Sequence, residues 1–151
     1  MASRGTGHLL LTASAAGLLT QLDSAPYAVT KHATVALAEW LAITYADTGV
    51  GVHCLCPQAV RTPMTDGQTT VLAAGGKILE PTQVAAATML DLAAGRFLLL
   101  PHPEVADYEK ARATDRDRWL AEWPGYAAAS PRYLLDQAGE GLQAAGRGMT
   151  R

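Results

Sequence analysis

Three residues have types and spacing that suit proton transfer. Tyr27 and Lys31 are four residues apart, and Ser14 precedes the tyrosine by 13 residues. Residues i and i+4 share one face of a helix, so a helix here would bring the Lys31 ammonium beside the phenol of Tyr27. A nearby cation favours the phenolate and so lets a phenol exchange protons more readily. A serine hydroxyl arriving from a neighbouring strand could then hold the oxygen that gains or loses the proton.

Each of these residues also has a plainer explanation. A tyrosine and a lysine at this spacing often form a helix surface pair with no function, and a serine is common at strand ends and turns. A second motif weighs against the plainer explanation. Residues 56–62 read Cys-Pro-Gln-Ala-Val-Arg-Thr and follow an apolar segment. The proline alone could simply end a strand, but its occurrence in register with Ser14, Tyr27 and Lys31 favours a catalytic interpretation.

Together, Leu10–Gly17, Tyr27–Lys31 and Cys56–Thr62 resemble the carboxyl half of a short-chain dehydrogenase/reductase, and the resemblance extends from about His8 to about Trp119. It implies an oxidoreductase that uses NAD or NADP to transfer a hydride between a carbonyl and an alcohol of a small-molecule substrate. By this resemblance Tyr27 is the acid/base and Ser14 orients the substrate oxygen. Lys31 favours the phenolate and hydrogen-bonds the nicotinamide ribose.

The resemblance also implies a set of cofactor contacts, at Tyr27, Lys31, Pro57, Val60 and Thr62. The segment after Pro57 would cradle the nicotinamide carboxamide through the Val60 backbone and the Thr62 hydroxyl. The family usually has glycine directly after the proline, where this chain has Gln58. Because glycine permits a closer backbone approach, this departure bears on how tightly the cofactor is held.

No dinucleotide fingerprint is found before Ser14. The G-x-G-x-x-G pattern follows a first strand and opens a helix, whereas Gly5-Thr6-Gly7 precedes a strand and lacks the third glycine. We therefore expect the amino-terminal cofactor half to be missing and the chain alone to show little or no turnover. One alternative is an inactive fragment or interaction module that docks on an intact subunit. Another is a misplaced start codon or a truncated gene.

The hydrophobic pattern predicts alternating strands and helices. Strands are expected at 8–13, 50–55 and 96–100, helices at 27–47, 81–92 and 104–123, and a long functional loop at 57–80. This order predicts an α/β fold, a partial Rossmann-like doubly wound parallel sheet of about three strands joined by right-handed crossovers. Residues 1–123 would form this unit, and the Ala/Gly/Arg-rich residues 124–151 a loosely ordered tail.

The helix at 27–47 is expected to have a broad apolar face, formed by Val29, Ala33, Ala36, Leu37, Trp40, Leu41 and Thr44. This helix is the predicted contact with a second copy of the chain or with a partner subunit of the same family. On the next strand, Cys54 and Cys56 fall on one side and His53 on the other. We expect buried free thiols and no metal site, because a structural metal needs about four ligands.

Composition bounds the remaining possibilities. The 151 residues are 49% hydrophobic and 17% charged, which indicates a globular chain. The formal net charge is -2, so the sequence lacks the excess of basic residues that favours binding to nucleic acid or an anionic membrane. No apolar run approaches the about 20 residues of a membrane helix. The run Leu9–Leu11 before Ala13-Ser14-Ala15 imitates a signal peptide but is shorter than the usual apolar core of about 7–15 residues. A cytoplasmic location is therefore expected.

Overall fold

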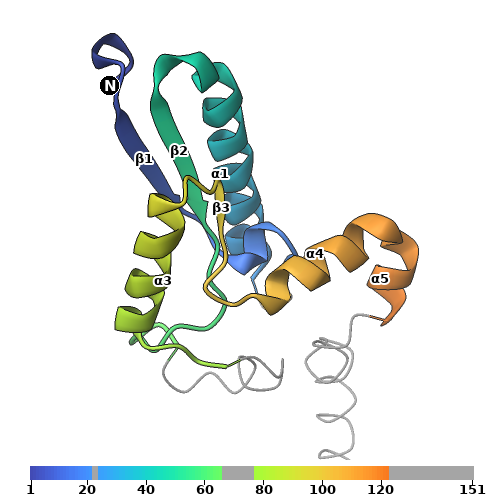
Figure 1. Ribbon diagram of the computed structural model, residues 1–151. Helices are drawn as coiled ribbons and strands as arrows, with labels where there is room; N and C mark the ends of the chain where they lie inside the picture. Colours follow the sequence, from blue (N-terminus) through green and yellow to red (C-terminus); the bar gives the residue numbers. More distant parts are fainter. Residues whose placement is uncertain (22–23, 66–76, 123–151) are drawn as a thin grey trace, which may run out of the picture.

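The computed structural model describes residues 1–21, 24–65 and 77–122. Its centre is a parallel sheet of three strands in the order β1-β2-β3, formed by β1 (Gly7–Thr12), β2 (Val50–Leu55) and β3 (Leu98–Leu99). The main helices are α1 (Ala25–Thr44), α3 (Pro81–Ala93), α4 (Glu104–Thr114) and α5 (Arg116–Glu122) (Figure 1). Short 3-10 turns are η1 (Ala2–Arg4), η2 (Ala15–Gly17) and η3 (Ala46–Thr48). The predicted α/β class with a parallel sheet is confirmed.

Most predicted elements are present, with three differences. The first long helix stops at Thr44, and its last predicted turn is η3. The third strand is reduced to two residues. The helix expected at 104–123 is two helices, because Asp115 adopts an extended backbone and its carboxylate accepts the Arg118 N–H at 2.9 Å, which caps α5. The predicted tail, 124–151, lies outside the described residues, so the domain boundary stays a prediction.

The two crossover helices cover opposite faces of the sheet. On one face Cys54 belongs to an apolar cluster with Val35 and Ala38 of α1. On the other face its neighbour Leu55 clusters with Val84 of α3 and with Leu99. Both crossovers advance in the same direction across the sheet, so helices on opposite faces give them opposite hands. The expectation that every crossover is right-handed is therefore wrong for one of the two.

Helix α1 packs on the sheet through small side chains. Its buried residues are Ala28, Val35 and Ala38, which let the helix backbone come close to β1 and β2. Much of the predicted apolar face points away from the sheet, with exposed fractions of 68% for Val29, 51% for Leu37 and 57% for Trp40. Ile43, which the prediction did not include, is 79% exposed. The apolar face read from the sequence is thus largely an outer face of the described structure. No helix in the described ranges combines the length and apolar character needed to cross a membrane.

Gly17 is the point of closest approach between η2 and α1. A Cβ atom at this position would lie 2.5 Å from the carbonyl oxygen of Lys31 and 3.0 Å from Cγ2 of Val35. The first distance is shorter than real Cβ contacts and the second is tighter than most of them, so the turn packs this closely on the helix only because residue 17 has no side chain. The turn begins with Ser14 as its N-cap, so this contact also fixes how Ser14 is placed relative to Lys31.

We expect Gly17→Ala to force α1 away from η2, because the new methyl group would overlap the Lys31 carbonyl. Overpacking of this kind typically costs about 1–3 kcal/mol of unfolding free energy. Urea denaturation measures the loss, and hydrogen exchange should show faster exchange of the α1 amides near Lys31 and Val35.

Gly95→Ala is the matched control. Gly95 has a positive φ of 69° but open space around its Cβ position. Its substitution should therefore cost only backbone strain of roughly 1–2 kcal/mol and leave α1 exchange unchanged. A Gly17→Ala chain with wild-type stability and wild-type α1 exchange would contradict the close-approach argument.

Candidate active site

Ser14 and Pro57 meet at the edge of the sheet where the parallel strands end. Ser14 follows β1 by two residues, and Pro57 follows β2 by two. The Ser14 hydroxyl accepts the Ala16 N–H at 3.1 Å and donates to the Pro57 carbonyl at 3.5 Å. The same carbonyl accepts the Ala15 N–H at 2.8 Å. The two motifs predicted from sequence to act together are therefore joined directly.

Tyr27 and Lys31 lie in the first turns of α1, beside the end of β1. Ser24 caps the helix by accepting the Tyr27 N–H at 3.4 Å, which places Tyr27 in the first turn. The Lys31 ammonium donates to the Thr12 carbonyl at 3.2 Å and lies over the Tyr27 ring, 5.5 Å from its centroid. A cation in this position is attracted by the face of an aromatic ring. The i, i+4 spacing thus brings the ammonium to the tyrosine, as the sequence predicted.

The tyrosine hydroxyl has no hydrogen-bond partner in the described ranges, and within them no hydrogen bond links Tyr27 to Ser14. Both side chains are half-buried. The structure therefore brings Lys31 to both the strand end and the tyrosine ring, and it joins Ser14 to Pro57. A substrate oxygen would have to supply the link between the two hydroxyls.

The segment after Pro57 is held by backbone pairing. Val60 and Leu79 form a parallel bridge, in which Arg61 N–H donates to Leu79 at 2.9 Å and Leu79 N–H donates to Ala59 at 3.0 Å. The Val60 carbonyl accepts the Thr65 hydroxyl at 2.7 Å. The Val60 N–H and the Thr62 hydroxyl make no hydrogen bond within the described part of the chain. Residues 66–76 of the predicted long loop lie outside the described residues.

Sequence reasoning missed two residues that hold this site. Gly17 carries the contact between η2 and α1, although the sequence offers it only as the last residue of the motif Leu10–Gly17. His102 receives the N–H of Gln58 at Nδ1, at 3.2 Å, and bonds the Lys77 carbonyl through Nε2 at 3.0 Å. The available signal is a histidine between two prolines, Pro101-His102-Pro103, directly after the third predicted strand.

The predicted free thiols are confirmed. Cys54 and Cys56 are fully buried and unbridged, with their sulfur atoms 3.7 Å apart. The hydrogen bond from Cys56 lowers the pKa of the Cys54 thiol, whereas that bond and burial both raise the pKa of Cys56. His53 bonds the Arg96 carbonyl and the ring of His8. Among the described residues no three metal-ligating side chains gather into a cluster.

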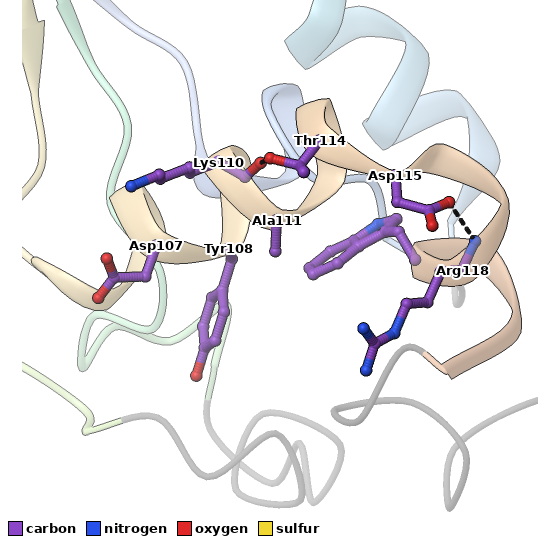
Figure 2. Close-up of a pocket in the computed structure, with 8 residues that line it drawn as sticks. Asp107, Tyr108, Lys110, Ala111, Thr114, Asp115 and Arg118 are labelled. Carbon is purple, nitrogen blue, oxygen red and sulfur yellow. Dashed lines mark hydrogen bonds between the residues drawn. The ribbon is translucent and has the colours of Figure 1, made fainter.

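A cavity of about 520 Å³ lies between α4 and α5 (Figure 2). It is lined by Asp107, Tyr108, Lys110, Ala111, Thr114, Asp115, Arg118 and Trp119. None of the four residues Ser14, Tyr27, Lys31 and Pro57 borders it. The hydrogen bond drawn across its rim, from Arg118 N–H to Asp115, belongs to the cap of α5. The chemistry of the candidate site therefore lies at the sheet edge and not in this cavity.

Comparison with known proteins points to one family. Residues 1–72 match the sequence profile of the family described as short chain dehydrogenase. A 1-deoxy-11-beta-hydroxypentalenate dehydrogenase of Streptomyces exfoliatus is 36% identical over 117 residues, which cover 77% of this chain and 40% of the relative.

Solved structures give the same picture of the fold. A short-chain dehydrogenase/reductase from Burkholderia phymatum in complex with NAD is 31% identical with a TM-score of 0.61, over 78% of this chain and 50% of that one. A short-chain dehydrogenase from Sphingobium yanoikuyae in complex with NADPH shares the fold, at 22% identity and a TM-score of 0.62, over 87% of this chain and 51% of that one.

The chain thus spans about half or less of the length of the relatives that it matches. Within that span, the profile match includes Ser14, Tyr27, Lys31 and the segment from Pro57 to Thr62. The sequence match and the likeness of fold together support this partial chain as a member of the short-chain dehydrogenase/reductase family.

Proposed function

We propose that this chain carries the catalytic part of an oxidoreductase that transfers a hydride between a nicotinamide cofactor and a carbonyl/alcohol pair of a small-molecule substrate. The observation that carries the proposal is the meeting of Ser14, Lys31 and Pro57 at one edge of the sheet. Tyr27 stands beside Lys31 with its hydroxyl free of partners within the described ranges. The relatives carry the names of dehydrogenases, which favours catalysis over a module that only docks.

In this proposal the three side chains share one proton-transfer task. Tyr27 gives a proton to the carbonyl oxygen during reduction, or takes it from the alcohol during oxidation. Lys31 holds positive charge over the tyrosine ring and so stabilises the phenolate that is left when the proton has gone. The Ser14 hydroxyl donates to the substrate oxygen in exchange for its long bond to Pro57, which keeps that oxygen at the tyrosine.

Residues of the chain are suited to a nicotinamide cofactor. The Val60 N–H and the Thr62 hydroxyl have no protein partner in the described ranges, so both are available to an amide group such as the carboxamide. Pro57 precedes them and follows β2 by two residues, and its own carbonyl accepts the Ser14 hydroxyl. The cofactor, when bound, supplies or accepts the hydride, and the protein positions it. NAD and NADP both remain candidates, since one structure with this fold holds NAD and another NADPH.

Binding is the first test. Titration of the purified chain with NADH and with NADPH, followed by energy transfer from tryptophan to nicotinamide, should show saturable binding of at least one of them. Thr62→Val removes the hydroxyl while it keeps the size of the side chain, so we expect weaker binding, by roughly fivefold to tenfold. A folded wild-type chain that binds neither nucleotide would overturn the proposed cofactor site.

Turnover is the second test, measured on the chain together with whatever partner it requires. Tyr27→Phe should reduce kcat by about 10²–10⁴-fold, because the acid/base is lost, while nucleotide affinity stays close to that of the wild type. Tyr45→Phe is the matched control, since it removes a phenol hydroxyl at the far end of α1. Equal activity of the two variants would exclude Tyr27 as the acid/base.

We also propose that the outer face of α1 binds a second copy of the chain or a related subunit. Val29, Leu37, Trp40 and Ile43 recur at helical spacing and are more than half exposed. Apolar side chains that cluster in this way on one helix face commonly mark an interface. The choice of a second copy or a related subunit as the partner follows from the family resemblance. The choice of the outer face of α1 follows from the exposure of these side chains.

Trp40→Glu should abolish association, because it places a charge in the centre of that face. Sedimentation velocity on the wild type and the variant gives the change in mass. Ala86→Glu adds the same charge to an exposed position of α3 and should leave association intact. A wild-type chain that stays monomeric at high concentration and in the presence of a related subunit would refute the interface.

A further inference from the structure

His102 lies between the two limbs of the segment that leaves the sheet at Pro57. It follows β3 by three residues and is 2% exposed. Its ring bonds Gln58 on the outgoing limb and Lys77 on the returning limb. One buried side chain therefore connects the end of β3 to both limbs.

The hydrogen-bond partners fix the proton positions on this ring. A backbone N–H can only donate, so Nδ1 must accept from Gln58 through its lone pair. A carbonyl can only accept, so Nε2 must carry the hydrogen that points to Lys77. Only the neutral ring with its hydrogen on Nε2 satisfies both partners. Position 102 thus needs an acceptor on one side and a donor on the other.

The bond to Gln58 matters because of where Gln58 stands. It is the first residue after Pro57, and Val60 and Thr62 follow within four residues. The bridge to Leu79 holds this limb at Ala59 and Arg61, beyond Gln58. The bond from Ser14 holds it at Pro57, before Gln58. The hydrogen bond from Gln58 to His102 attaches the limb between these two points.

The Gln58 side chain does not provide an alternative to the hydrogen bond with His102. Its Oε1 atom is buried and has no hydrogen-bond partner within the described ranges. The backbone of Gln58 is therefore oriented through its N–H and not through its amide group. Loss of the histidine acceptor would leave both groups of this residue without protein partners.

We propose that His102 is a positioning residue for the nicotinamide-contacting segment 57–62. It holds the Gln58 backbone so that the Val60 N–H and the Thr62 hydroxyl keep the places that the cofactor requires. This inference rests on the proposed function. It assigns a role to a residue outside both sequence motifs, in the turn between β3 and α4, which the proposed chemistry does not otherwise use.

Two nearly isosteric substitutions separate the two hydrogen bonds. In His102→Asn the side-chain oxygen lies close to the place of Nδ1, so it can still accept from Gln58. In His102→Gln the amide nitrogen reaches the place of Nε2, so it can still donate to Lys77, but the acceptor for Gln58 is lost. His102→Leu removes both bonds. Circular dichroism first establishes that the variants fold.

Amide hydrogen exchange and nucleotide binding are then measured on the same samples. We expect the Gln58 amide to exchange at least roughly tenfold faster in His102→Gln than in His102→Asn, because only the glutamine variant loses the buried hydrogen bond that protects this amide. The Kd for NADH or NADPH should rise by a similar factor in His102→Gln and stay within about twofold of the wild type in His102→Asn. His102→Leu should resemble the glutamine variant in Gln58 exchange.

Both the exchange measurement and the binding measurement have an outcome that overturns the inference. Asparagine and glutamine variants with equal exchange at Gln58 and equal Kd, whether both are wild-type or both are weakened, would show that the bond to Gln58 does not position the segment. If the wild type binds neither nucleotide, the proposed function itself fails and the inference falls with it. A wild type that binds while the two variants do not differ rejects the role of His102 alone.

Discussion

The arrangement at the candidate site depends on how closely the turn after β1 can approach the first helix. Lys31 can reach the Thr12 carbonyl only if the first turns of α1 lie directly against η2. That approach brings the Lys31 backbone to a distance from Gly17 at which no side chain fits. Because Ser14 caps the same turn, the missing side chain at position 17 governs the relative placement of the serine and the lysine.

A second constraint comes from the parallel sheet. Its strands end at one edge, so the residues that follow β1, β2 and β3 gather there although they are far apart in the sequence. Ser14 comes from the first, Pro57 from the second and His102 from the third. Hydrogen bonds then connect them in pairs, Ser14 to Pro57 and His102 to Gln58. The edge forms a connected polar network above an apolar sheet whose two faces are covered by α1 and α3.

The surfaces that remain exposed are apolar in two places. The outer face of α1 carries Leu37 and Trp40, and the edge strand β1 exposes Leu9 and Leu10. In the described residues β1 pairs on one side only, with β2. An unpaired strand edge and an apolar helix face are both surfaces that proteins normally cover. The proposed association through α1 would cover one of them.

The sequence by itself determined the candidate catalytic residues and the kinds of element that hold them. Period and spacing sufficed for β1, α1, β2 and α3, because amphipathic and apolar patterns are local properties, and they placed Tyr27 and Lys31 on one helix face. Local patterns could not supply contacts between distant segments. The packing of Gly17 on Lys31, the bonds of His102 and the placement of α3 opposite α1 each depend on residues more than ten positions apart. The same reason explains the apolar face of α1: a hydrophobic period shows that a face is apolar, but only the tertiary structure decides which face meets the sheet.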